Sequence, residues 1–432
     1  MLKYETKNNE AYIDGVNLVK LAKEYKTPMY VISYSKLKEN IKEFKDSFQD
    51  KYENVKVHYA SKANLSIGLA RIMQNNDFGL DIVSAGELYI AKQAGVNLKN
   101  VEFNGNNKTY EDIEFGIKEE IGYFVVDNEY ELDLIQEIAQ KHNKIQNILF
   151  RITPEVSGGA HEKINTGQKD SKFGVPITND IFKNVLKRAL EMPNISVKGI
   201  HFHVGSQLHE NNTHLKAIDV VINIAKQLQS EYNFEIEVLN IGGGFGIEYT
   251  NDEKAPSLSY YFEPIMEKIT TGFKELNYSQ RPKVVIEPGR YMIGEAGFSL
   301  YEIGSIKDIP GIRKYVGING GMCDNIRPSM YQAKYEAILA NKAEQKPQEE
   351  VRIAGNCCES GDILIENIKL PIIESHDILC VFSTGAYGYS MASNYNMNRI
   401  PKTVLIENGN IQLMIKEQSF EQLIENDCDI KL

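Results

Sequence analysis

Residues 79–94 read GLDIVSAGELYIAKQA, a β-rich run at Gly79–Val83 followed by a helical stretch at Glu87–Ala94. The first run is short and apolar, as expected of a parallel strand that is covered on both faces. The second has apolar residues at helical spacing. Because parallel strands must be joined by a crossover, which is usually a helix, repetition of this unit predicts a parallel sheet.

The unit recurs between about residues 55 and 290. Eight strand candidates are present, at Val55–Tyr59, Gly79–Val83, Val101–Asn104, Tyr123–Asp127, Ile148–Ile152, Lys198–His203, Ile236–Ile241 and Lys283–Glu287. Further amphipathic stretches lie between them, at Tyr130–Lys141, Thr178–Leu190 and Thr213–Ser230. Eight repeats predict an α/β fold of the (β/α)8 TIM-barrel type, and the alternative is an open doubly wound sheet.

The pattern changes after Arg290. Runs such as FSLYEIGSIKDI, DILCVFST and KTVLIENGNIQLMIKE are strand-like and are separated by turn residues, which is typical of antiparallel β structure. A further strand-like run, YVISY, occurs at residues 30–34. We expect a barrel domain at residues 36–285. Residues 1–35 and 286–432 are expected to form a mainly antiparallel β-barrel or β-sandwich domain.

The composition narrows the possible functions. The 432 residues include 42% hydrophobic and 25% charged residues, as in ordinary globular proteins, and the formal net charge is −11. A surface of this charge repels phosphate backbones and anionic lipids, so we expect no nucleic-acid or membrane partner. The first residues lack the apolar segment of a signal peptide, and no CxxC spacing links the five cysteines. We therefore expect a cytoplasmic protein without a bound metal.

Side chains that could take part in catalysis lie on or just after several of the predicted barrel strands. Lys62 lies just after the first strand and Asp81 lies on the second, while His203 and Ser206 come at and after the end of the sixth. The active site of a (β/α)8 barrel lies at the carboxyl ends of its strands. These four residues are therefore candidates for one site.

Two glycine-containing loops follow the last two strands, where such barrels often bind phosphate. One contains Gly242–Gly244, and the other is the run Glu287-Pro288-Gly289-Arg290. Glycine allows backbone N–H groups to approach an oxyanion, and arginine adds a fork of donors. Ile247 stands where the last glycine of a GxGxxG motif would be, so the dinucleotide fingerprint is absent.

A lysine at the barrel mouth, a phosphate loop and a carboxylate on the final strand together suggest pyridoxal phosphate. Lys62 would bind the cofactor aldehyde covalently, and the glycines would hold the phosphate. Glu287 would pair with the pyridinium nitrogen, and His203 would stack on the ring.

The chain also resembles the diaminopimelate decarboxylase family, which belongs to the fold-type III, alanine-racemase-like pyridoxal-phosphate enzymes. The matching segments are YASKAN, DIVSAGELYIAKQAGV, FNGNNKT, TGQKDSKFGV, HFHVGSQ, NIGGGFGI, EPGR, GMCDNIRPSMY, CCESGD and TGAYGYSMASNYN. They occur in family order from about residue 10 to the C-terminus, so the resemblance covers essentially the whole chain.

The resemblance implies a role for each matching residue. The implied catalytic residues are Lys62, Cys358 as the general acid, and His203. The implied cofactor-binding residues are Lys62, Asp81, His203, Ser206, Gly244, Glu287, Pro288, Gly289, Arg290 and Tyr387. The implied substrate-binding residues are Arg290, Arg327 and Tyr331 for the distal carboxylate, Glu359 for the distal ammonium group, and Tyr387.

The implied reaction converts meso-2,6-diaminopimelate to L-lysine and CO2, the last step of bacterial-type lysine biosynthesis. The substrate has an amino-acid group at each end, and only one end reacts. Recognition of the other end requires a planar cation for its carboxylate and an anion for its ammonium group, which two arginines and a glutamate supply. The resemblance also implies a homodimer in which the CESGD segment of one subunit reaches the barrel mouth of the other.

Several alternatives remain open at this stage. The chain could decarboxylate a related diamino acid, such as a siderophore precursor, ornithine, arginine or lysine. It could also be a non-catalytic pyridoxal-phosphate carrier or a racemase. Asn319 and Cys357 depart from the family pattern, and the second thiol beside Cys358 leaves open which cysteine donates the proton. Whether the segment at 160–172 closes as a lid is also undetermined.

Overall fold

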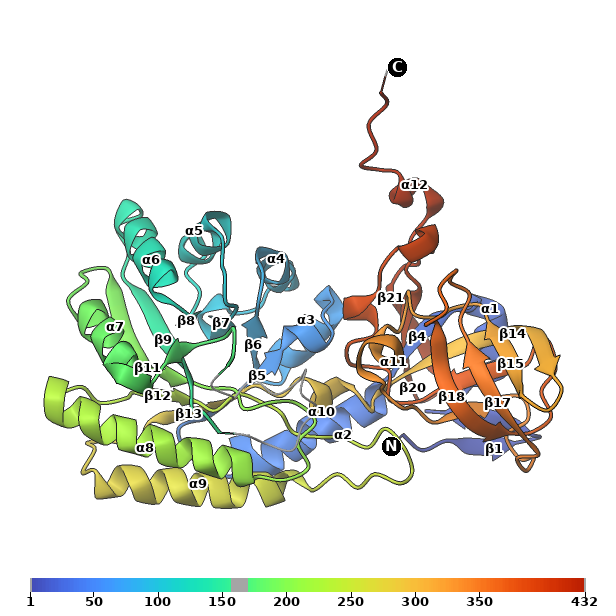
Figure 1. The fold of residues 1–432 in the computed structure, drawn as a ribbon, viewed down its shortest axis with the longest axis horizontal. Coiled ribbons are helices and arrows are strands. Elements are labelled where there is room, and N and C mark those ends of the chain that lie inside the picture. Colours follow the sequence, from blue (N-terminus) through green and yellow to red (C-terminus); the bar gives the residue numbers. More distant parts are fainter. Residues whose placement is uncertain (1, 157–169, 431–432) are drawn as a thin grey trace. The chain divides into compact units, whose positions relative to one another are not determined.

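The computed structural model of the protein describes residues 2–156 and 170–430, and most of the segment considered as a lid lies outside them. The chain forms two compact units, one of residues 1–40, 247–254 and 291–432 and the other of residues 41–246 and 255–290 (Figure 1). We call the first the β unit and the second the barrel unit. Among the described residues, no helix is both long enough and apolar enough to cross a membrane.

The barrel unit contains the eight predicted parallel strands. They are β5 (Val55–Ala60), β6 (Gly79–Ile82), β7 (Val101–Phe103), β8 (Tyr123–Val126), β9 (Gln146–Thr153), β11 (Ile195–His201), β12 (Val238–Asn240) and β13 (Lys283–Ile286). Neighbouring strands pair in chain order, and pairing of β13 with β5 closes the sheet. The short strand β10 (Val175–Pro176) adds to β9. The predicted (β/α)8 barrel is therefore confirmed, and the open sheet is excluded.

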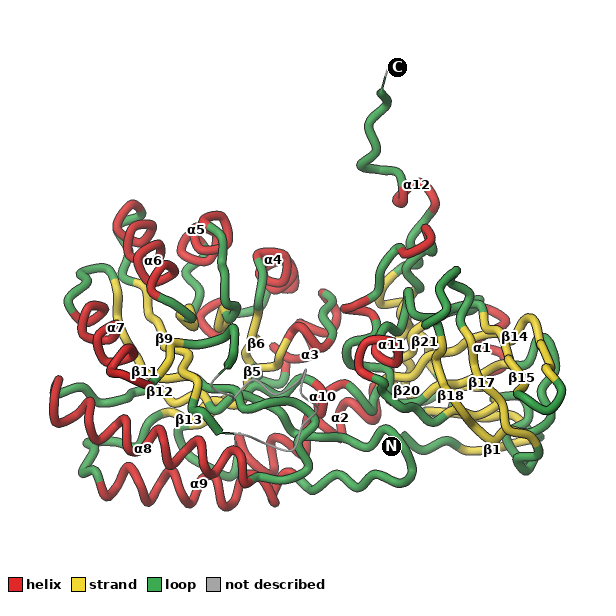
Figure 2. Tube along the Cα trace, viewed as in Figure 1, coloured by secondary structure: helices red, strands yellow, loops and turns green. Residues whose placement is uncertain are grey.

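Helices surround these strands, as Figures 1 and 2 show. They are α3 (Ile67–Asn75), α4 (Ala85–Ala94), α5 (Tyr110–Lys118), α6 (Glu129–Lys141), α7 (Ile181–Leu190), α8 (Asn212–Tyr232) and α9 (Leu258–Glu275). Ser84 and Asn128 cap the N-termini of α4 and α6 with their side chains, and Thr109 forms a capping box with Asp112 at α5. Such caps satisfy backbone N–H groups that a helix leaves unpaired. They therefore help to fix where each strand gives way to its helix.

The β unit is built mainly on one nine-stranded sheet. Its strands are β4 (Met29–Ser33), β14 (Gly297–Ile309), β15 (Arg313–Ile318), β16 (Ala337–Leu339), β17 (Glu349–Ala354), β18 (Ile363–Leu370), β19 (Ile378–Val381), β20 (Lys402–Glu407) and β21 (Asn410–Ile415). Most pairs are antiparallel, while β15–β17 and β4–β20 are parallel. A separate small sheet contains β1 (Glu5–Lys7), β2 (Glu10–Ile13) and β3 (Val16–Asn17). The mainly antiparallel β structure expected after Arg290 is therefore present.

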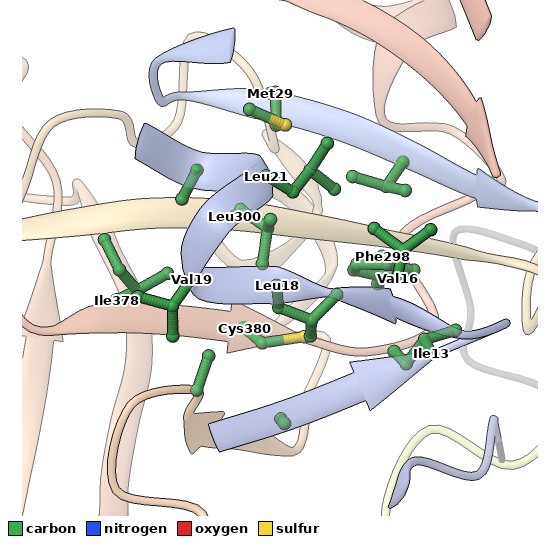
Figure 3. Packing of buried hydrophobic residues seen from close by; sticks show 14 of the residues in the cluster. Ile13, Val16, Leu18, Val19, Leu21, Met29, Phe298, Leu300, Ile378 and Cys380 are labelled. Carbon is green, nitrogen blue, oxygen red and sulfur yellow. The ribbon is translucent and has the colours of Figure 1, made fainter. Parts of the chain in front are cut away.

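Three short helices complete the β unit, α1 (Leu18–Tyr25), α11 (Arg327–Tyr331) and α12 (Phe420–Leu423). Two further helices lie where the chain passes between units, α2 (Tyr34–Phe44) and α10 (Arg290–Ile293). One core of the β unit gathers apolar side chains between α1 and the strands β14 and β19, including Leu18, Leu300 and Cys380 (Figure 3). Burial of this apolar face is what attaches α1 to the sheet.

Three segments differ from the expected domain division: residues 36–40 belong to the β unit, residues 286–290 belong to the barrel unit, and the third segment is 247–254. Residues 247–254 were counted with the barrel, but they form part of the β unit. The physical reason is aromatic packing: the rings of Tyr249 and Tyr335 meet edge to face, with centroids 5.5 Å apart, and both side chains are buried.

Candidate active site

Lys62 lies in a short 3-10 turn, Ser61–Ala63, directly after strand β5. Its Nζ is 3.3 Å from Oδ2 of Asp81, which is fully buried on β6. Burial and the charge of Glu287 raise the pKa of Asp81 to about 6, although Lys62 opposes the shift. The lysine side chain is 41% exposed while its carboxylate partner is inaccessible. The amine is therefore held at a defined point and can still be reached by a ligand.

Glu287 follows strand β13 and lies in a buried polar network. Its Oε1 accepts hydrogen bonds from Nδ2 of Asn104 (3.0 Å) and Nδ2 of Asn240 (2.8 Å). Nε2 of His201 lies 2.9 Å from its Oε2. Burial raises the pKa of Glu287, but His201 and Lys62 outweigh that effect and hold the pKa well below its usual range. Glu287 is consequently a buried carboxylate that stays ionised.

Three members of this network were not predicted from the sequence. Asn104, Asn240 and His201 lie at or just after the carboxyl ends of β7, β12 and β11. They could have been identified from the sequence, because a polar residue at the end of an apolar strand faces the barrel mouth. Asn104 also donates to Asp81 at 2.7 Å, so one amide joins the carboxylates of Asp81 and Glu287.

The glycine run after β12 is required by close packing. A Cβ at Gly243 would lie 2.1 Å from the carbonyl oxygen of Glu287, and one at Gly244 would lie 2.5 Å from that of Gly205. Gly244 also has a φ of +105°, which L-residues rarely adopt. The N–H of Gly242 donates to Oδ1 of Asn240 (2.8 Å). The loop is thus packed closely against the barrel, at positions that only glycine can occupy.

His203 is bonded to the same loop. The N–H of Gly243 donates to its Nδ1 at 3.2 Å. Burial, Lys62 and Arg151 lower the pKa of His203 well below its usual value, so the ring is neutral. Since Nδ1 accepts a hydrogen bond, the proton of the neutral imidazole is on Nε2.

Ser206 and Arg290 meet beside the glycine loop. Nη2 of Arg290 donates to Oγ of Ser206 at 3.0 Å. The loop of Ser206 is attached to the glycine loop through reciprocal backbone bonds of Leu208, whose N–H donates to Gly244 and whose carbonyl oxygen accepts from Gly246. This places a guanidinium, a hydroxyl and the glycine loop in one group.

The rest of the EPGR run contacts the Lys62 turn. The carbonyl oxygen of Pro288 accepts from the N–H of Ala60 at 3.1 Å. A Cβ on Gly289 would lie 3.1 Å from the Cβ atoms of both Ala60 and Ala63. The barrel unit therefore brings together the candidates that the sequence placed in the barrel with residues 287–290, which it placed in the β domain.

The remaining candidates lie in the β unit. Arg327, at the start of α11, is buried, with Cζ 4.5 Å from the ring centroid of Tyr249 and 5.5 Å from that of Tyr335. Its Nη1 also donates to the Tyr335 hydroxyl. Burial lowers its pKa, but Tyr249 and Tyr335 more than compensate, and the net pKa is raised. Tyr331 lies one turn further along α11 and is half-buried.

Cys358 and Glu359 are exposed in the loop between β17 and β18. The N–H of Cys358 donates to Oδ1 of Asn396 at 2.7 Å, and Oε1 of Glu359 accepts from the N–H of Gly361 at 3.2 Å. A thiol and a carboxylate are thus presented outward from neighbouring positions.

Tyr387 is half-buried with a φ of +60°, an uncommon backbone conformation for a bulky residue. Tyr387 is among the groups that raise the pKa of Arg327, so the two side chains lie within electrostatic range. Asn319 joins β-unit segments, since its Oδ1 accepts from the N–H of Glu302 (2.9 Å) and its Nδ2 donates to Oγ1 of Thr27 (2.8 Å). The contacts of Asn319 are therefore structural.

Comparison with known proteins fits this arrangement. Residues 35–294 match the family described as "Pyridoxal-dependent decarboxylase, pyridoxal binding domain". The diaminopimelate decarboxylase of Halalkalibacterium halodurans is 42% identical over 97% of this chain and 95% of its own length. The chain belongs to the diaminopimelate decarboxylase family.

Two other members of the diaminopimelate decarboxylase family extend the comparison. The Bacillus subtilis enzyme is 40% identical over 97% of this chain and 95% of its own. The crystal structure of the Methanocaldococcus jannaschii enzyme in complex with L-lysine is 36% identical, with a TM-score of 0.92, and the match covers 100% of this chain and 99% of that one. The resemblance seen in the sequence is therefore confirmed over both units.

Proposed function

We propose that the protein is a pyridoxal-phosphate-dependent decarboxylase that converts meso-2,6-diaminopimelate to L-lysine and CO2. The observation that carries the proposal is the placement of Lys62 beside a buried carboxylate at the mouth of the barrel. The names of the full-length relatives support the substrate, and the L-lysine in one related crystal structure matches the expected product.

The residues of the barrel unit fit pyridoxal phosphate. Gly244 gives the loop a backbone conformation that a side chain would not allow, and Ser206 and Arg290 place a hydroxyl and a guanidinium beside the loop, which suits a phosphate group. Lys62 supplies the amine that would bind the aldehyde. When bound, the cofactor supplies an aromatic system that accepts the electrons of a breaking bond.

Each barrel-unit side chain has a defined task in this proposal. Glu287, whose pKa is held well below its usual range, would keep a proton on the pyridine nitrogen of the cofactor. Neutral His203, bonded to the N–H of Gly243, would pack on the ring. Asp81 keeps Lys62 in place and, because Asn104 joins it to Glu287, couples the amine to the pyridine end of the site. Pro288 and Gly289 hold the loop after β13 against the turn that carries Lys62.

The β unit supplies groups for the rest of the reaction. Cys358 donates a proton to the carbon that has lost CO2. Arg327, with Arg290 and Tyr331, binds the distal carboxylate of the substrate, Glu359 binds the distal ammonium group, and Tyr387 reaches the cofactor. A buried, permanently charged guanidinium such as Arg327 suits a planar carboxylate.

The test uses the purified protein with pyridoxal phosphate and meso-diaminopimelate. We expect CO2 and L-lysine in equal amounts, and borohydride reduction should fix the cofactor on Lys62. Lys62→Ala should lose more than about a thousandfold in kcat. Lys56→Ala is a matched control, because Lys56 lies on β5, the strand that precedes Lys62, but pairs with the exposed carboxylate of Asp77. Equal turnover of L-lysine, ornithine or arginine would contradict the assigned substrate.

We further propose a homodimer in which the Cys358 loop of one subunit completes the barrel site of the other. The exposure of Cys358 and Glu359 supports this. Mixing inactive Lys62→Ala and Cys358→Ala proteins under subunit exchange should restore about a quarter of the activity of the same concentration of unaltered protein, because half of the chains are then in mixed dimers with one intact site. Exchange without recovery would contradict the shared site. A cytoplasmic location is also proposed, supported by five cysteines that are all free thiols.

A further inference from the structure

Two buried cysteines that the proposed reaction does not use lie together in the β unit. Cys323 is 6% exposed and Cys357 is 8% exposed. They come from different loops, one after β15 and the other after β17. Each cysteine is among the groups that shift the pKa of the other, as expected of neighbouring side chains.

A single carboxylate holds the two loops together. Oδ1 of Asp362 accepts from the N–H of Met322 at 2.7 Å, and its Oδ2 accepts from the N–H of Cys357 at 2.8 Å. Both oxygens belong to the same carboxylate group, so the backbone N–H groups of Met322 and Cys357 are both held within hydrogen-bond distance of that one group. Gly321 and Gly355 allow this approach, because a Cβ on either would lie within 2.4 Å of an Asp362 oxygen.

A third segment bridges the same pair from another direction. The N–H of Ser393 donates to the carbonyl oxygen of Cys323 at 2.9 Å, and Nδ2 of Asn398 lies 3.8 Å from the sulfur of Cys357. Both cysteines are therefore fixed by contacts on separate elements, and their proximity does not depend on one flexible loop.

We propose that Cys323 and Cys357 form an oxidisable dithiol, which a low-molecular-weight disulfide converts to an intramolecular disulfide beside Cys358. The other three cysteines are placed differently. Cys380 is enclosed in the core around α1, and Cys428 and Cys358 are exposed. Exposed thiols without a buried partner form mixed disulfides with the oxidant instead.

The exchange proceeds in two balanced steps. The thiolate of Cys357 attacks the oxidant RSSR, forming a mixed disulfide and releasing RS⁻, which takes up the proton lost from Cys357. The sulfur of Cys323 then attacks that of Cys357, forming the internal S–S bond and releasing the second RS⁻, which takes up the Cys323 proton. The two thiols are oxidised, and one RSSR is reduced to two RSH.

The surroundings of Cys323 and Cys357 determine the rate at which the disulfide forms. Burial is the largest cause that raises the pKa of both thiols; Asp362 adds to it for both, and Asp324 adds to it for Cys323. Because only the thiolate attacks, we expect the rate to rise by about tenfold per pH unit between pH 7 and 8.5.

The experiment treats the full-length, cofactor-loaded protein with oxidised glutathione, blocks residual thiols with iodoacetamide and maps disulfides by mass spectrometry. Because Cys357 and Cys358 share a tryptic peptide, the same treatment is applied to Cys358→Ser and Cys357→Ser. We expect the Cys323 peptide to be linked in the unaltered protein and in Cys358→Ser, but not in Cys357→Ser. Cys428 should carry glutathione in all three and serves as the internal control for oxidation.

A second measurement does not depend on a cysteine variant. A bond between residues 323 and 357 constrains the unfolded chain, so oxidation should raise the denaturant midpoint of the unaltered protein, and dithiothreitol should reverse the change. The proposal is overturned if both cysteines take up iodoacetamide while Cys428 is fully glutathionylated. It is equally overturned if the link maps to Cys358, since the exposed thiol would then be the partner.

Discussion

Nε2 of His201 lies 2.9 Å from Oε2 of Glu287, and both side chains are buried. The other carboxylate oxygen accepts from two asparagine amides, so all contacts described for this carboxylate stabilise its negative charge. A buried carboxylate that remains ionised is the group needed opposite a protonated ring nitrogen. The network behind Glu287 therefore matters as much for the chemistry as Glu287 itself.

Replacing Glu287 by glutamine tests this relationship. Glu287→Gln keeps the size of the side chain but removes its charge, so we expect kcat for meso-diaminopimelate to fall by about 100- to 1000-fold with little change in KM. Steady-state kinetics of CO2 release measures both constants. Glu237→Gln is the control, because Glu237 pairs with Lys198 at the surface and should behave as the unaltered protein. An unchanged kcat in Glu287→Gln would contradict the assignment.

The glycine loop offers a steric test with a matched control. Gly243→Ala would place a Cβ 2.1 Å from the Glu287 carbonyl oxygen, so the loop must move. We expect the free energy of unfolding to fall by about 1–3 kcal/mol and pyridoxal phosphate to bind at least tenfold more weakly. At Gly86 in α4, the nearest atom to an added Cβ is Oγ of Ser84 at 3.6 Å, so Gly86→Ala should be tolerated. Denaturant unfolding and cofactor titration distinguish the two variants.

Substrate selection is tested at Arg327. Arg327→Ala removes the buried guanidinium that is proposed to bind the distal carboxylate, and we expect KM for meso-diaminopimelate to rise by about 100-fold. Arg352 on β17 also lies over a tyrosine ring, at 5.8 Å from Tyr315, but pairs with Glu366 and has no proposed ligand. Arg352→Ala should leave KM unchanged. Equal KM values for the two variants would show that Arg327 serves only packing.

The barrel could be predicted from the sequence because its strands share a recognisable pattern. Each is a short apolar run with a polar residue at its end, and this pattern survives even where the hydrogen-bonded strand is only Val238–Asn240. The place of residues 247–254 was not predictable in the same way. That segment follows a barrel strand, and contacts with residues far away in the sequence, such as the packing of Tyr249 against Tyr335 and Arg327, place it in the β unit.

Some residues of the candidate site could likewise be predicted from the local sequence, and others could not. Lys62, Glu287 and the glycines could be located from strand ends, since the barrel geometry brings those ends together. Arg327, Cys358 and Glu359 were found only through the family resemblance, because nothing in their local sequence specifies which distant residues they meet. The proximity of Cys323 and Cys357 could not be predicted from spacing, since it depends on Asp362 binding both loops.

Asp324 gives the protein a specific dependence of stability on pH. Burial raises its pKa from 3.8 to about 7, although the Tyr301 hydroxyl and the Gly321 N–H donate to it. Between about pH 4 and pH 7 the folded chain therefore keeps a proton that the unfolded chain has lost. Since the unfolded state then binds fewer protons, the free energy of unfolding must fall as the pH rises through this window, by about 4 kcal/mol at most.

Asp324→Asn removes this titration, because an amide is neutral at every pH in the window. Urea unfolding of the unaltered protein and of Asp324→Asn at pH 4.5 and pH 8 measures the difference, and contributions from all other groups cancel in the comparison. We expect the unaltered protein to lose more stability between the two values than the variant does, by about 2–4 kcal/mol. The same loss in both proteins would mean that Asp324 is already ionised in the folded state at pH 4.5, which its burial beside Tyr301 argues against.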